Sequence, residues 1–203
     1  MLHTMAENYA RKLGDKLNSD DKQIEIYTYG LETLLLTLLT LSVVLFLAHT
    51  LAILPTTLLA LAVFAVFRCV GGGAHLSTYP RCFLFGSCLM LGQGFLPATI
   101  SIGLIPLLLL FVSLIVIAFY LTWKWVPADT EKRPVRDEKI RSAHKLYMSV
   151  CIIIWIIMFS MLINYENYTL ALAAITGAIS SLFLISPWGY RLLKAIDRGL
   201  EKK

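Results

Sequence analysis

The chain has 203 residues, of which 58% are hydrophobic and only 15% are charged, and its formal net charge is +5. A soluble domain usually carries about 25% charged residues, so this composition excludes an ordinary soluble protein and indicates an integral membrane protein. Binding to nucleic acid is not expected either, because the positive charge lies beside apolar segments, with no soluble domain to present it.

The first 30 residues form a polar leader without the apolar core of a cleavable signal peptide, so we expect them to remain on the protein. Within the leader, Met5, Tyr9, Leu13 and Leu17 recur at every fourth position with charged residues between them. This spacing is typical of an amphipathic helix. Such a helix either lies on the membrane surface or packs on cytoplasmic loops of the protein, and the sequence leaves both alternatives open.

The membrane spans are predicted from apolar windows, because a helix needs about 20 apolar residues to cross a bilayer. Four windows are long enough, and they cover residues 31–51, 102–121, 146–163 and 168–185. Two shorter windows, 54–67 and 83–96, are predicted to be short spans or a re-entrant pair. The sequence therefore predicts an all-α, polytopic membrane helix bundle of about six transmembrane segments.

The chain is predicted to be a single membrane domain, with a leader at 1–30, spans within 31–185 and a basic tail at 186–203. All Lys and Arg residues fall into four groups, at 11–22, 68–81, 124–145 and 191–203. With six spans these groups share one side of the membrane, and the opposite connections contain none. Because positive loops favour the cytoplasm, we expect both termini and the two internal basic segments to be cytoplasmic.

Between the two short windows lies a polar segment, RCVGGGAHLSTYPRC, that runs from Arg68 to Cys82. In a continuous helix His75 and Cys82 would be about 10 Å apart along the axis, too far for a base to reach its nucleophile. The three glycines before His75 and Pro80 after it break that helix. Cys82 would then lie near a helix N-terminus, which favours a thiolate, so the spacing allows a Cys–His dyad.

Other interpretations of this segment are weaker or remain open. No Gly-Lys-Ser/Thr follows the glycines, which excludes a phosphate-binding loop. A zinc site built from Cys69, His75, Cys82 and Cys88 matches no common ligand spacing, and neither a metal nor an organic cofactor is expected. The four cysteines are predicted to be free thiols, with Cys88 and Cys151 as small core residues. A purely structural role for His75 and Cys82 stays open.

Arg68, Gly73, His75 and Cys82, the loop VPADTEKRPV at 126–135 and the pattern of spans together resemble the accessory gene regulator protein B family. Its members are membrane cysteine endopeptidases that process precursors of cyclic autoinducing peptides in Gram-positive bacteria. The resemblance implies His75 as the general base and Cys82 as the nucleophile, supported by Arg68 and Gly73.

The resemblance also implies a reaction and partners. Cys82 would cleave the C-terminal tail from a small amphipathic quorum-sensing propeptide through a thioester acyl-enzyme, and cyclisation would give a thiolactone or a lactone. The implied location is the bacterial cell membrane, where the lipid bilayer is a partner and a homodimer is a further expectation.

Three questions stay open in the sequence. Lys132, Arg133 and Arg136 either attract an acidic tail of the precursor or only enforce the topology. A third catalytic residue is not identified, although Glu32 or Gln93 are candidates. The alternative function is a small membrane transporter with a Gly-rich gating loop, which is disfavoured because the long windows contain few polar residues beyond Ser and Thr.

Overall fold

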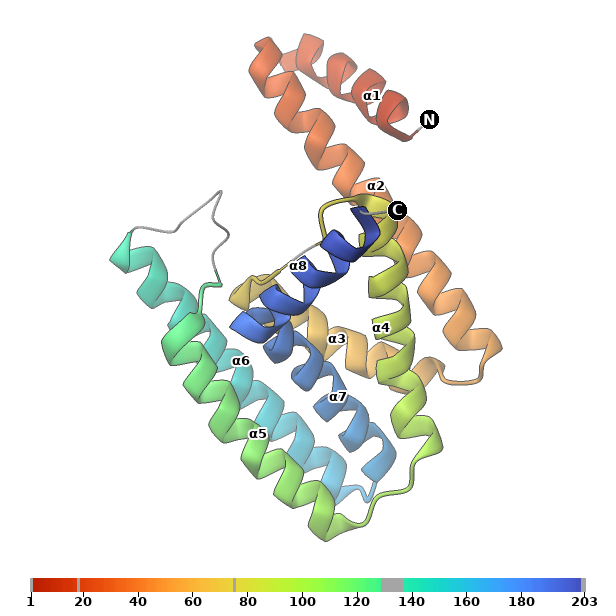
Figure 1. Ribbon diagram of the computed structural model, residues 1–203, viewed down its shortest axis with the longest axis vertical. Helices are drawn as coiled ribbons and strands as arrows, with labels where there is room; N and C mark the ends of the chain where they lie inside the picture. The colour runs from red at the N-terminus through yellow and green to blue at the C-terminus, as the bar shows by residue number, and fades with distance from the viewer. Residues whose placement is uncertain (1, 18, 75, 129–136, 202–203) are drawn as a thin grey trace. The chain divides into compact units, whose positions relative to one another are not determined.

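The computed structural model describes residues 2–17, 19–74, 76–128 and 137–201, and within them the chain forms eight α-helices and no β-strand (Figure 1). The helices are α1 (Leu2–Leu17), α2 (Asp21–Thr50), α3 (Leu54–Gly71), α4 (Tyr79–Thr99), α5 (Leu104–Trp125), α6 (Glu138–Asn164), α7 (Tyr168–Ile185) and α8 (Pro187–Glu201). The predicted all-α fold is confirmed. The chain divides within α2 into two compact units, Met1–Phe46 and Leu47–Lys203, and its organisation as one membrane domain stays a prediction.

In the first unit, α1 packs against the first turns of α2 through small residues. Ala6 and Ala10 are fully buried, and a Cβ atom added at Gly14 would lie 2.6 Å from Ile24. His3 at the other end of α1 contacts Glu32 at 3.0 Å, so the two helices run antiparallel.

The predicted leader helix is therefore present, but the predicted apolar face does not make this contact. Met5, Tyr9, Leu13 and Leu17 are between 42% and 61% exposed. The small side chains are the ones that allow the two helix backbones to approach closely, which explains why they form the packed face.

Six helices, α2 to α7, are long and apolar enough to cross a membrane, by length and composition. The predicted number of spans is thus confirmed, and the chain is membrane-embedded. The two windows predicted to be short are full-length helices, because α3 has 18 residues and α4 has 21. At 1.5 Å per residue they are about 27 and 32 Å long. The predicted windows were shorter because an apolar window ends at the first polar side chain. The helix itself continues, since its backbone hydrogen bonds also form between polar residues.

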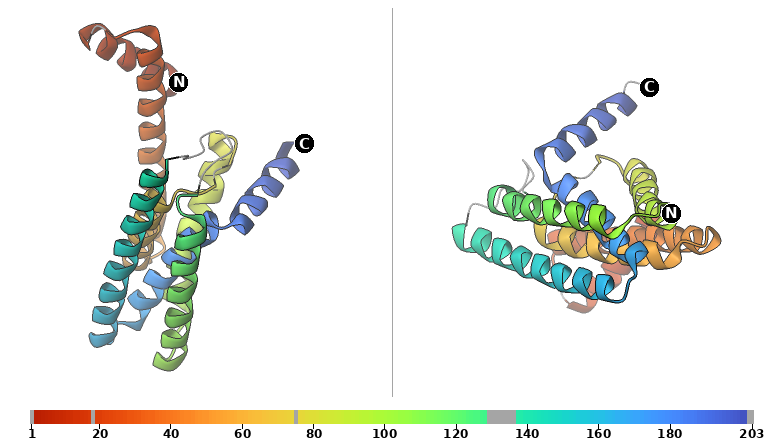
Figure 2. Two further views of the ribbon diagram at one scale, coloured as in Figure 1. Left: turned by 90° about the vertical axis from the view of Figure 1, so that its left-hand side faces the viewer. Right: turned by 90° about the horizontal axis from the view of Figure 1, so that it is seen from below.

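Helix α7 lies at the centre of the second unit (Figures 1 and 2) and is the most buried of the six spans, with 61% of its apolar window inside the protein. It approaches α3 closely, because a Cβ atom at Gly177 would collide with the carbonyl oxygen of Ala60. On the opposite side, Trp155 of α6 donates from Nε1 to the Ala174 carbonyl at 3.2 Å and contacts the rings of Phe67 and Phe111. These contacts fix α7 between its neighbours.

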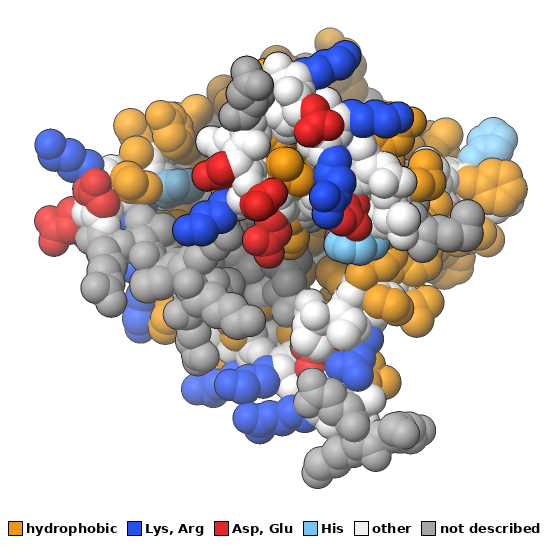
Figure 3. All heavy atoms as spheres, turned by 90° about the horizontal axis from the view of Figure 1, so that it is seen from above, with side chains coloured by type: hydrophobic (Ala, Val, Ile, Leu, Met, Phe, Trp, Pro, Cys, Tyr) orange, Lys and Arg blue, Asp and Glu red, His pale blue; other side chains and the backbone are white. Residues whose placement is uncertain are grey.

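One end of the second unit brings together the ends of several helices. The last turns of α3, α5 and α7 meet there, together with the first turn of α4 and with α8. Every described Lys and Arg of the second unit lies in the helix ends or connections on this side. Figure 3, which draws the side chains of both units, shows Lys and Arg together with Asp and Glu side chains. This distribution agrees with the positive-inside rule, and the cytoplasmic orientation stays a prediction.

Candidate active site

The glycine-rich loop begins where α3 ends, and its conformation requires glycine. Gly72 and Gly73 have φ angles of +72° and +128°, which side chains with a Cβ atom rarely adopt. A Cβ atom at Gly73 would collide with Nη1 of Arg68 and would lie 2.8 Å from the carbonyl oxygen of Leu184. The loop therefore crosses directly over the Arg68 side chain, with no room for a larger residue.

Arg68, in the last turn of α3, binds this loop through two hydrogen bonds. Its Nη1 donates to the carbonyl oxygen of Gly72 at 2.9 Å, and its Nη2 donates to the carbonyl oxygen of Ala74. Both bonds involve a charged donor, which makes them stronger than neutral hydrogen bonds. The structure thus places Arg68 and Gly73, two of the predicted site residues, in direct contact.

Two further hydrogen bonds connect the loop to the ends of α5 and α7. The N–H of Ala128, which follows α5, donates to the carbonyl oxygen of Gly71 at 2.8 Å, and the N–H of Ala74 donates to the carbonyl oxygen of Leu184 at 3.2 Å. The hydroxyl of Tyr190 in α8 donates to the carbonyl oxygen of Ala128 at 3.1 Å. The three consecutive glycines therefore occupy a crossing point of chain segments that come from α3, α5 and α7.

Helix α4 begins immediately after the loop and carries Cys82 in its first turn. The N-cap residue Thr78 is extended, and Pro80 is the second residue of the helix, where its missing N–H costs nothing. The predicted helix break before Cys82 is confirmed. The N–H of Cys82 donates to the carbonyl oxygen of Thr78 at 3.0 Å, so this N–H is already used and does not serve an oxyanion in this arrangement.

The thiol of Cys82 is partly buried against a small apolar cluster formed by Phe64, Ala74, Leu76, Leu184 and Leu193. The cluster draws its residues from α3, the loop, α7 and α8. Cys82 lies in the first turn of α4, at the positive end of the helix dipole, which attracts negative charge.

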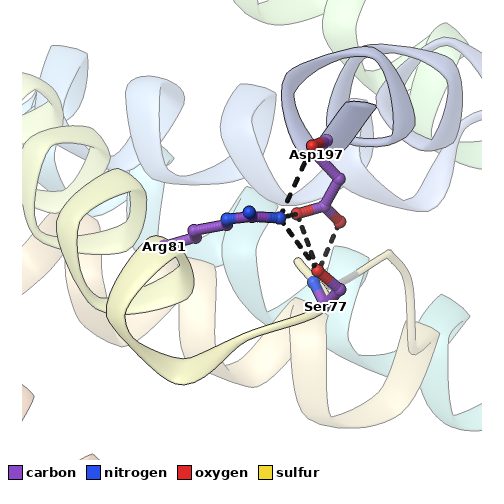
Figure 4. Close-up of polar contacts among 3 residues, drawn as sticks. All are labelled: Ser77, Arg81 and Asp197. Atoms are coloured by element: carbon purple, nitrogen blue, oxygen red, sulfur yellow. Dashed lines mark hydrogen bonds and ion pairs between the residues drawn. The ribbon is translucent and has the colours of Figure 1, made fainter. Parts of the chain in front are cut away.

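A polar cluster that the sequence analysis missed joins the loop to α8 (Figure 4). The carboxylate of Asp197 accepts hydrogen bonds from the backbone N–H of Ser77 at 2.9 Å and from its hydroxyl at 3.0 Å. Nη1 of Arg81 lies 3.3 Å from the same carboxylate. Burial raises the pKa of Asp197, but the bonds from Ser77 and Arg81 lower it by more, so the net pKa lies below its usual value.

The signal for this cluster was present in the tail sequence. Asp197 follows Leu193 by four residues and therefore lies on the same face of a helix. The tail was interpreted only from its net positive charge, which does not reveal one acid on the inner face.

Several predicted site residues lie outside the described residues, namely His75, Lys132, Arg133 and Arg136. Glu32 contacts His3 within the first unit. Gln93 is buried in α4, eleven residues beyond Cys82 and so about 16 Å further along the helix, which removes it as a partner of the thiol.

The four cysteines are free thiols, as predicted. The prediction that Cys88 is a core residue is wrong, because it is exposed on α4, whereas Cys151 is partly buried and packs against the main core. Among the residues that the structure describes, no group of three or more His, Cys, Asp or Glu side chains could hold a metal ion.

Comparisons with known proteins show which sequences the chain is similar to. The chain is 27% identical to the AgrB-like protein 2 of Clostridium perfringens strain 13 and 25% identical to the AgrB-like protein of strain SM101, in each case over 100% of this chain and 99% of the relative. No solved structure matches. A sequence profile of the family described as accessory gene regulator B matches residues 6–185, which includes all six candidate spans. The chain therefore belongs to the accessory gene regulator B family, which connects it with accessory gene regulation and the processing of autoinducing peptides.

Proposed function

We propose that the chain is a membrane cysteine endopeptidase that cleaves and cyclises a small quorum-sensing propeptide on the cytoplasmic side of the membrane. The observation that carries this proposal is the position of Cys82 in the first turn of α4, directly after the loop that Arg68 holds. His75 belongs to the loop that Arg68 and Gly73 shape. In the sequence, His75 follows Ala74, whose carbonyl oxygen accepts from Arg68, and precedes Cys82 by seven residues.

In the proposed reaction His75 takes the proton of the Cys82 thiol, and the thiolate attacks a peptide carbonyl of the precursor. The C–N bond breaks, His75 returns the proton to the leaving amine, and the tail departs. The rest of the precursor remains attached to Cys82 as a thioester. Family membership and the helix N-terminus under Cys82 support this assignment.

Ring closure would follow by thioester exchange. The thiolate of an internal cysteine of the precursor attacks the acyl-enzyme, which forms a thiolactone and releases Cys82; a serine hydroxyl would give a lactone. Exchange between two thioesters is nearly balanced in energy, so closure competes with hydrolysis where water is excluded. Forming the first thioester from an amide is uphill, and removal of the released tail draws the reaction forward.

Lys132, Arg133 and Arg136 of the basic loop would attract an acidic tail on the precursor. This part of the proposal depends on charge alone. The transporter alternative receives less support, because the loop that would act as a gate is held by Arg68, Ala128 and Leu184.

The proposal is tested without knowing the precursor. The native host is compared with a host that carries Cys82→Ala, and peptides in the culture fluid are searched for a species lighter than its linear fragment by one water. We expect this cyclic species only with Cys82, and His75→Ala should abolish it as well. A cyclic product that persists in the Cys82→Ala host would refute the proposal.

A second experiment follows the purified protein with iodoacetamide between about pH 5 and 9. Cys82 should react faster than Cys69 at low pH and should lose this advantage in His75→Ala. Cys69 is a suitable internal reference because it is exposed in the last turn of α3, whereas Cys88 lies within a candidate span.

A further inference from the structure

A tight bend at Ser186 joins α7 to α8. Ser186 lies between the two helices, and its hydroxyl donates to the carbonyl oxygen of Phe183 at 2.7 Å and accepts from the N–H of Gly189 at 3.4 Å. A Cβ atom at Gly189 would collide with the Phe183 carbonyl and would lie 2.7 Å from the Cα atom of Leu184. Glycine at position 189 therefore permits the first turn of α8 to approach the last turn of α7 closely.

The inner face of α8 meets the segment that carries the proposed dyad. Leu193 is 3% exposed and belongs to the apolar cluster around Leu76, against which Cys82 and Ile196 also pack. Leu193, Ile196 and Asp197 are spaced as one helix face. The face thus combines an apolar contact with one carboxylate.

Asp197 contacts two residues of this segment, Ser77 and Arg81. Its two carboxylate oxygens accept from the N–H and hydroxyl of Ser77, and one of them also lies beside Nη1 of Arg81. Arg81 Nη1 further donates to the carbonyl oxygen of Asp197 at 3.4 Å and to the Ser77 hydroxyl at 3.3 Å. Ser77 is two residues beyond His75, and Arg81 directly precedes Cys82.

The carboxylate is partly buried, because the side chain of Asp197 is 16% exposed and that of Arg81 is 21% exposed. Partly buried, charge-assisted bonds are worth more than exposed ion pairs. Figure 4 shows Asp197 directed from α8 toward both partners. The residues matched by the family profile end at 185, before α8 begins.

We propose that Asp197 is a positioning residue for Cys82 that acts by holding Ser77 and Arg81, an inference that rests on the proposed function. Asp197 has no part in the bond changes. Its role is to fix the segment that leads into Cys82 from a helix 116 to 120 residues away. Reactive groups displaced by about 1 Å can lose about a hundredfold in rate, so a loosened segment should show a clear loss.

The test compares Asp197→Ala, Asp197→Glu and the control Arg198→Gln in the full chain. Arg198 is the next residue of α8 and is exposed, so its substitution removes a charge without touching the loop. The readouts are the rate of Cys82 alkylation by iodoacetamide relative to Cys69, and the amount of cyclic peptide released by the native host. Circular dichroism shows whether each variant is folded.

We expect Asp197→Ala to lower both readouts at least about tenfold, Asp197→Glu to recover them to within about threefold of the parent, and Arg198→Gln to leave them unchanged. A folded Asp197→Ala protein with parental values would overturn the inference, as would a Glu variant no better than Ala. If Asp197→Ala does not fold, Ser77→Ala decides: a loss of about threefold or more supports the role of Asp197, and parental values overturn it.

The outcome is separable from that of the proposed function. Release of cyclic peptide by the Cys82→Ala host refutes the endopeptidase assignment. Loss of release with Cys82→Ala, together with full activity of Asp197→Ala, refutes only the positioning role.

Discussion

Replacing Gly73 by alanine should disable the proposed site while leaving the helices intact. The added methyl group would occupy the position of Arg68 Nη1 and approach the Leu184 carbonyl oxygen to 2.8 Å, at a φ of +128°. Backbone strain of this kind costs about 1–3 kcal/mol. Displacing the guanidinium loses at least one hydrogen bond of a charged donor, which is worth about 1.5–3 kcal/mol.

Together these losses disfavour the present loop conformation by about 2.5–6 kcal/mol. A tenfold change corresponds to about 1.4 kcal/mol, so the population of the correct loop should fall by roughly sixtyfold or more. The release of cyclic peptide and the low-pH alkylation of Cys82 should fall by the same factor.

Gly86→Ala is the matched control, because nothing lies within 4 Å of a Cβ atom at Gly86 in α4. Alanine there should be neutral or stabilise the helix by up to about 1 kcal/mol. The reasoning is refuted if Gly73→Ala and Gly86→Ala proteins have the same Cys82 alkylation rate and release the same amount of peptide.

Three further outcomes are expected. Reversing Lys132 and Arg133 to Glu should lower peptide release at normal membrane insertion, and unchanged release would remove the substrate contact. The pKa of His3 is raised by its hydrogen bond to Glu32, so the stability from this contact is full below the unfolded pKa of about 6.5 and is lost as the pH rises through the higher folded value. The protection of α1 against hydrogen exchange, taken relative to the intrinsic rate at each pH, should fall over that range, but not in His3→Ala. Gly189→Val should push the first turn of α8 away from Phe183 and Leu184, and it should slow Cys82 alkylation as Asp197→Ala does. A parental alkylation rate would contradict the proposed role of this close contact.

The spans and the helix break before Cys82 could be predicted because they depend on local composition. The length of an apolar run indicates a membrane span because it must match the hydrophobic thickness of the bilayer. Pro80 indicates a helix start because proline is favoured in the first turn of a helix. The lengths of α3 and α4 could not be obtained this way. Their polar ends, such as Arg68, are stabilised in the helix by partners in other segments.

The face of α1 that contacts α2 could not be predicted from the sequence for a related reason. The pattern of Met5, Tyr9, Leu13 and Leu17 identifies a helix, but the choice of contact face depends on the partner. Close packing against α2 favours Ala6 and Ala10, since their small side chains let the backbones approach. Periodicity in one segment contains no information about the shape of the other.

The support of the site was the least predictable part. Asp197 contacts residues 116 and 120 positions earlier in the chain, and such pairings are fixed only by the assembled fold. The glycines signalled a sharp turn. Their crossing with Ala128 and Leu184 required the positions of α5 and α7.

The crossing of the loop with the end of α7 has a consequence for biosynthesis. Ala74 is held by Leu184, which the ribosome adds about 100 residues after Cys82, or about 5 to 20 seconds later at 5–20 residues per second. Helix α4, which carries Cys82, is therefore synthesised before α7, whose Leu184 binds the loop. A nascent or truncated chain that lacks α7 should carry the nucleophile without the loop conformation that we propose activates it, which delays catalysis until the last span has inserted.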